Sequence, residues 1–65
     1  MQKKLKRNRI RCKHCGDIIE SKTIYDFQRC KCGAVGIDGG LHYPKRVYRS
    51  NPAELHYEEL SEYKL

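Results

Sequence analysis

The sequence contains little material for a hydrophobic core. Its 65 residues include no tryptophan, one phenylalanine and one methionine, and only 38% of them are hydrophobic. A chain of this size buries only about 60% of the surface of its unfolded form, and such chains usually depend on disulfides, a metal or a partner to stay folded. The composition therefore predicts one small domain with an internal cross-link.

Long apolar stretches are also missing. No run is long enough to cross a bilayer, and the basic start, MQKKLKR, is not followed by the apolar segment of an export signal. We therefore expect a cytoplasmic protein with no membrane contact. Cytosolic cysteines stay reduced, so two disulfides are the less favoured use of the four cysteines. A bridge within C-x-C would also be strained.

The four cysteines form two short pairs, each followed at once by glycine: Cys12 with Cys15, and Cys30 with Cys32. Glycine allows the chain to turn back with positive φ, so two tight turns can present four sulfurs to one ion. The pattern predicts one structural Zn²⁺ bound by all four thiolates, with no position left for a catalytic water. In an alternative Cys₃His site, His42 replaces one cysteine.

The middle of the chain is typical of short β-strands. We predict strands at residues 18–20, 23–29, 34–37 and 41–49, with a hairpin turn at Asp38-Gly39-Gly40. The predicted fold is a small zinc-stabilised α+β domain: a zinc β-ribbon with two knuckles and a three-stranded antiparallel sheet, followed by a C-terminal helix. Its expected core is Ile10, Ile18, Ile19, Ile24, Phe27, Val35, Ile37, Leu41 and Val47.

The tail changes to a helical period. Asn51-Pro52-Ala53-Glu54 is typical of a helix start, and an apolar stripe follows at His56, Tyr57, Leu60 and Tyr63. Because so short a helix is marginal alone, we expect the stripe to pack on the ribbon or bind a partner. The domain prediction is a flexible basic arm at 1–9, a zinc ribbon at 10–49 and an amphipathic helix at 50–65.

Charge is distributed unevenly. Residues 1–13 contain seven cations and no acid, whereas residues 51–65 contain four glutamates. Cations with aromatic residues between them suit nucleic acid, whether DNA or RNA. The opposite charges of the two ends could instead pair two chains head to tail, or hold arm and tail together within one chain. The candidate nucleic-acid-binding residues are Lys3, Lys4, Lys6, Arg7, Arg9, Arg11, Lys13, Tyr43, Lys45, Arg46, Tyr48 and Arg49.

Catalysis has no support in the sequence. The two serines in turn-like places, Ser21 and Ser50, belong to no triad pattern. Gly36 and Gly39-Gly40 do not form a phosphate-binding loop, because no Lys-Ser or Lys-Thr follows them. We therefore expect a protein that is not an enzyme and has no small-molecule substrate.

Several motifs occur in order: RCKHCGDIIES at 11–21, DF at 26–27, CKCG at 30–33 and DGGL at 38–41. In these motifs, over roughly residues 10–43, the chain resembles a family of small uncharacterised zinc-ribbon-like proteins of Firmicute bacteria and their phages. The resemblance implies a zinc-ribbon-like domain in a bacterial host cytosol, and only the four cysteines transfer as functional residues. The second pair is C-x-C where ribbons usually have C-x-x-C, so its turn must be tighter.

These observations favour a non-enzymatic interaction module that binds a protein partner. In its narrowest form it is a phage-encoded modulator or inhibitor of a host protein. The alternative is a nucleic-acid-binding zinc ribbon that uses the basic arm and the strand from Tyr43 to Arg49.

Overall fold

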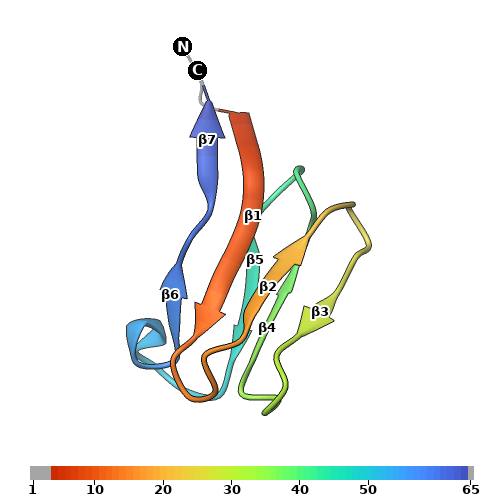
Figure 1. Ribbon diagram of the computed structural model, residues 1–65. Coiled ribbons are helices and arrows are strands. Elements are labelled where there is room, and N and C mark those ends of the chain that lie inside the picture. Colours follow the sequence, from red (N-terminus) through yellow and green to blue (C-terminus); the bar gives the residue numbers. More distant parts are fainter. Residues whose placement is uncertain (1–3, 65) are drawn as a thin grey trace.

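Two antiparallel sheets pack against each other in the computed structural model, which describes residues 4–64 (Figure 1). In this range there is one 3-10 turn, η1 (Ala53–Leu55), and no longer helix. The strands are β1 (Lys4–Cys12), β2 (Ile18–Ser21), β3 (Gln28–Arg29), β4 (Val35–Asp38), β5 (Lys45–Tyr48), β6 (Tyr57–Glu59) and β7 (Glu62–Lys64).

The first sheet is built around β1. Strand β2 pairs with one edge of β1, with Ile10 opposite Ile19, while β6 and β7 pair with its other edge, with Ile10 opposite Glu59. The tail therefore runs back along the whole length of β1, as the blue and red strands of Figure 1 show.

The expected flexible arm is wrong for residues 4–9, because these residues belong to β1; residues 1–3 lie outside the described part of the chain. The physical reason is a period of two. Asn8, Ile10 and Cys12 are buried on the inner face, and the arginines that alternate with them lie on the other face. The arginines Arg7, Arg9 and Arg11 all form salt bridges with glutamates of the tail. The basic start and the acidic tail therefore pair within one chain, which is one of the possibilities that the sequence left open.

The expected C-terminal helix is also wrong. Asn51 does not cap a helix; its Oδ1 accepts a hydrogen bond from the Tyr48 hydroxyl, and η1 ends after three residues. The tail then becomes strand. As strands, these residues form backbone hydrogen bonds with β1 and place their glutamates opposite its arginines, whereas a free helix would be marginal in water.

The second sheet has the order β3-β4-β5, and it confirms the predicted three-stranded antiparallel sheet. Only the last two residues of the predicted strand at 23–29 pair as strand. The predicted turn at Asp38-Gly39-Gly40 is present. Both glycines have positive φ, and the N–H of His42 donates to the Gly39 carbonyl.

The core lies between the two sheets. It consists of Ile10, Cys12, Ile19, Cys30, Ala34, Val35 and Ile37, with Tyr48 and Tyr57 packed against it. Three residues predicted for the core are exposed instead: Ile18 at 50%, Phe27 at 45% and Leu41 at 48%.

A buried polar contact of Asn8 joins the two sheets near the turn between β4 and β5. Asn8 of β1 is fully buried, and its Nδ2 donates to the carbonyls of Asp38 and Gly40, each at 2.9 Å. Its Oδ1 accepts from Nη1 of Arg46 at 2.6 Å. One amide thus connects β1 to the β4–β5 turn.

Nothing helical within residues 4–64 is long and apolar enough to traverse a bilayer.

Candidate metal centre

The two cysteine pairs lie in turns at the same end of the molecule. Cys12 ends β1 and Cys15 follows in the next turn, while Cys30 and Cys32 lie in the turn between β3 and β4. Each turn closes by a backbone hydrogen bond, from Gly16 N–H to the Cys12 carbonyl and from the second glycine's N–H to Cys30. Both glycines have φ near +77°, at +78° and +76°, as the sequence predicted.

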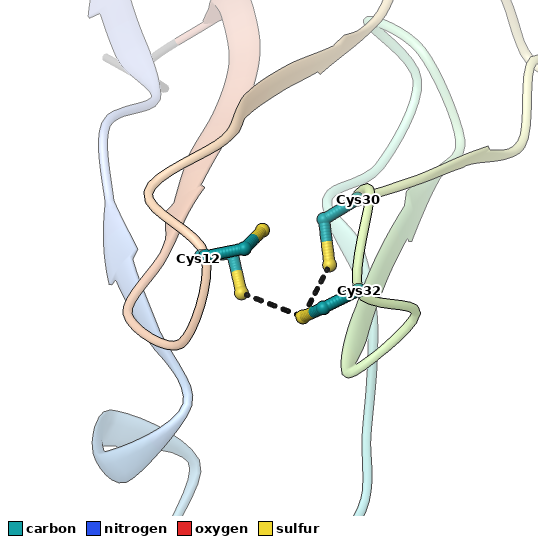
Figure 2. A group of neighbouring side chains, drawn as sticks. Cys12, Cys30 and Cys32 are labelled. Carbon is teal, nitrogen blue, oxygen red and sulfur yellow. Dashed lines mark hydrogen bonds between the residues drawn. The ribbon is translucent and has the colours of Figure 1, made fainter.

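The four sulfurs converge on one point. Their Sγ atoms all lie within 4.8 Å of one another. The Cys32 sulfur is 3.6 Å from that of Cys12 and 3.6 Å from that of Cys30, as the dashed lines in Figure 2 show. A tetrahedron with metal–sulfur bonds of about 2.3 Å has sulfur–sulfur edges of about 3.8 Å. The cluster therefore has the size that a tetrathiolate metal site requires.

The sulfurs perturb one another's protonation. Burial raises the pKa of Cys30, but hydrogen bonds from the Val35 N–H and the three neighbouring thiols outweigh it and lower that pKa to about 6. For Cys32, the Ala34 N–H lowers the pKa, but burial and the neighbouring thiols raise it to about 11. Four thiols this close cannot all ionise without a cation among them. A divalent metal would replace the protons that they share.

The site is closed on one side and open on the other. Cys12 and Cys30 are buried in the core, whereas Cys15 and Cys32 are exposed. The backbone N–H of His14 donates to the Cys12 sulfur at 3.3 Å. Such a donor stabilises a thiolate ligand, and the buried pair anchors the site to the core.

His42 does not join the cluster. Among the described residues, the four cysteines alone make up the group that could hold a metal. His42 lies in the β4–β5 turn and lines an open pocket with Lys4 and Tyr63. His42 therefore lies outside the site, and the alternative Cys₃His set of ligands is wrong.

The contact between two histidines beside the first cysteine turn was not predicted from the sequence. Nε2 of His14 lies 2.9 Å from Nδ1 of His56, which is 8% exposed. The N–H of Lys13 also donates to the His56 carbonyl. The helical pattern assigned to the tail placed His56 on a stripe with Tyr57 and hid this contact, which ties the tail to the first cysteine turn.

The predicted nucleic-acid residues are divided by the structure. Arg46 is buried at 8% exposure of its side chain, Tyr48 packs on the core, and the arginines of β1 are ion-paired. Lys13 donates to the Glu54 carbonyl. Lys3 lies outside the described residues. Among the described residues, the exposed members that form no salt bridge are Lys4, Lys6, Lys13, Tyr43, Lys45 and Arg49.

The predicted partner-binding stripe does not exist as a surface. Without a helix its four residues separate: His56 is buried, Tyr57 and Leu60 are partly buried, and Tyr63 is 50% exposed on β7. This correction follows from the strand geometry of the tail, in which neighbouring residues alternate between faces.

Searches of curated proteins and of solved structures found no match. A family model described as Domain of unknown function (DUF7695) matches residues 4–48, from the start of β1 to the end of β5, and so includes all four cysteines. On the strength of that match over most of its length, the chain belongs to the DUF7695 family.

Proposed function

We propose that this chain is a non-enzymatic binding module held together by one structural Zn²⁺. The observation that supports this most strongly is the convergence of four cysteine sulfurs within 4.8 Å of one another. A tetrahedral set of four thiolates is typical of zinc and of iron, and zinc is the metal of small structural knuckles of this spacing.

The proposed metal has a structural role because the four thiolates complete its coordination. No position remains for a water or substrate, which a catalytic zinc would need. A structural zinc site contributes roughly 10–16 kcal/mol to the folding of a small domain. The core consists of only seven buried apolar residues, so the metal would decide whether the chain folds.

The histidines near the site do not argue for catalysis. The Ser50 hydroxyl lies 3.4 Å from Nε2 of His56, at the outer limit of a hydrogen bond. The other nitrogen of His56 faces His14, not a carboxylate that could orient the ring as in a hydrolase triad. Both histidines instead connect the tail to the first cysteine turn.

For the partner we favour nucleic acid over protein. The helical stripe that would have docked a protein is absent from the described residues, whereas exposed cations and aromatic rings remain. The competing hypothesis is a protein partner, in its narrowest form a host protein bound by a phage-encoded modulator. Zinc-bound thiolates require a reducing environment, which supports a cytoplasmic location.

Metal analysis of purified protein tests the zinc proposal. We expect one zinc per chain in the wild type and in His42→Ala. We expect Cys30→Ser to lose its metal to a competing chelator at a concentration that leaves the wild type loaded. Iron in place of zinc, or retention of metal by Cys30→Ser as tightly as by the wild type, would contradict the proposal.

A further inference from the structure

The outer face of the first sheet is electrically balanced. Arg7 and Arg9 both reach Glu62, at 3.6 and 2.8 Å. Arg11 lies 3.4 Å from Glu58. Each of these arginines of β1 is thus opposite a carboxylate of the same chain. Arg7 also lies 3.8 Å from Glu20, so three arginines are paired with three glutamates on this sheet. This face therefore offers little net charge to a polyanion, although the sequence suggested these arginines for that role.

The outer face of the β3–β4–β5 sheet differs. The register places Arg29, Gly36 and Val47 in one row across the three strands. The next row pairs Ile37 with Arg46, and both of these side chains point into the protein. Because successive residues of a strand alternate, the first row must face outward.

The cations on this outer face form no salt bridge within the part of the chain that the structure describes. Lys45 lies opposite Asp38 in the register, yet the Asp38 carboxylate accepts a hydrogen bond from the Gly39 N–H. Within residues 4–64, none of Arg29, Lys45 and Arg49 takes part in a salt bridge. All three are exposed, and Arg49 directly follows β5.

An aromatic ring lies on the same face. A Cβ added to Gly36 would lie 2.9 Å from Cζ of Phe27, so the ring rests directly on the backbone of β4. The Arg29 guanidinium carbon lies 5.3 Å from the ring centroid, a cation–π distance. Phe27 nevertheless remains 45% exposed. Gly36 and Arg29 both lie against this ring, and solvent still reaches it.

We propose that the outer face of the β3–β4–β5 sheet binds single-stranded nucleic acid, with a base stacked on Phe27 and phosphates held by Arg29, Lys45 and Arg49. This inference rests on the proposed function and names its partner. We call these four residues the stacking face.

The stacking face suits a single strand more than a duplex or a protein. An exposed aromatic ring accepts any unpaired base, and base stacking of this kind is worth about 1–3 kcal/mol. Bases in a duplex are already stacked on each other and cannot reach the ring. Arg29 lies beside the ring, and Lys45 and Arg49 lie on and just after β5 at the other edge of the sheet, so cations are present at both edges to contact a phosphate backbone.

Fluorescence anisotropy with the zinc-loaded full chain and a labelled oligothymidylate tests this proposal. We expect binding at low salt that weakens as salt rises, with a log–log slope of roughly −2 for three phosphate contacts. Phe27→Leu keeps an apolar side chain on Gly36 but removes the π face, and it should weaken binding about five- to a hundredfold. Arg29→Gln should weaken binding and reduce the slope by about one.

Arg11→Gln is the matched control, because it removes the same charge from the ion-paired face of the first sheet. It should leave the affinity within about twofold of the wild type. Zinc content and circular dichroism of each variant confirm that it is folded.

Three results would overturn the proposal: no binding of the oligonucleotide at low salt, an unchanged affinity in Phe27→Leu, or an equal loss in Arg11→Gln and Arg29→Gln. Duplex bound as tightly as single strand would overturn it as well. If the protein proves zinc-loaded and folded yet binds no strand, the stacking face is wrong and the structural zinc site stands.

Discussion

Arg46 donates two hydrogen bonds to the carboxylate of Glu59, through Nε at 3.1 Å and Nη2 at 2.5 Å. The same guanidinium donates to Oδ1 of the buried Asn8. One cation of β5 thus joins the second sheet to two strands of the first, because Asn8 belongs to β1 and Glu59 to β6. Its side chain is only 8% exposed, so these contacts replace the water that the charge would otherwise bind.

Removal of this cation should therefore be costly. Arg46→Ala leaves the Asn8 oxygen buried without a donor, and we expect the free energy of unfolding to fall by about 1–3 kcal/mol. Glu59→Gln keeps an acceptor opposite Arg46, and the Glu59 carboxylate is half exposed. We therefore expect this variant to lose less free energy of unfolding than Arg46→Ala. Urea denaturation at a fixed free zinc concentration measures both, since metal binding itself shifts the midpoint.

Equal losses in the two variants would contradict this account of Arg46. So would an Arg46→Ala protein as stable as the wild type, because the Asn8 contact would then contribute nothing.

Two glycines with positive φ allow a second comparison. A Cβ at Gly40 would lie 2.2 Å from the Thr23 carbonyl carbon, whereas one at Gly16 would meet nothing within 4 Å. Gly16→Ala should cost only the backbone strain of a left-handed alanine, about 1–2 kcal/mol. Gly40→Ala must also push two loops apart, and we expect it to lose soluble, zinc-loaded protein. Thermal unfolding of the two variants makes the test, and similar midpoints would show that the loops are not packed as described.

The tail provides a third prediction. A chain that ends after Ser50 keeps all four cysteines but removes β6 and β7, which leaves one edge of β1 unpaired. It also leaves Arg9 and Arg11 without their carboxylates, and Arg7 with Glu20 alone. We expect this truncated chain to bind zinc, to unfold at lower urea concentration than the full chain, and to self-associate. Size-exclusion chromatography and denaturation detect these changes. A monomer of undiminished stability would show that the tail strands do not support β1.

How far the sequence predicts this fold differs between its centre and its ends. The cysteine turns and the turn at Gly39-Gly40 depend on local residue chemistry, namely paired thiols and glycines with positive φ, and both were predicted. The tail depends on a partner about fifty residues away. The segment from Tyr57 to Lys64 fits a helical stripe as well as a strand, and pairing with β1 decides between them.

The charges contained the missing information. Basic residues at alternate positions 7, 9 and 11 and acidic residues at 58, 59 and 62 are complementary when the two segments lie antiparallel. Read as separate segments, they indicated a flexible arm and an amphipathic helix. The stacking face was likewise hidden, because it joins residues of β3 with residues of β5 across a glycine.

The protonation of the cysteines predicts how zinc affinity depends on pH. The Ala34 N–H lowers the pKa of Cys32, but burial and the neighbouring thiols outweigh it and raise that pKa to about 11, so near neutral pH this thiol keeps its proton until metal displaces it. Binding then releases at least one proton, and affinity must rise with pH. We expect the apparent affinity for Zn²⁺ to increase at least about tenfold per pH unit between pH 7 and 9. Competition with a chelator of known pH dependence measures it, and a flat profile would mean that the four thiols are already ionised.

The mass of the natively folded protein tests the central claim most directly. Under non-denaturing conditions, protein from metal-replete cells should appear as the chain plus one zinc ion, with two protons fewer than the reduced chain at the same charge. Removal of that zinc by a chelator should abolish the β-sheet signal in circular dichroism. A mass equal to the metal-free chain with free thiols or two disulfides, or an unchanged circular dichroism spectrum after zinc has left, would contradict the account.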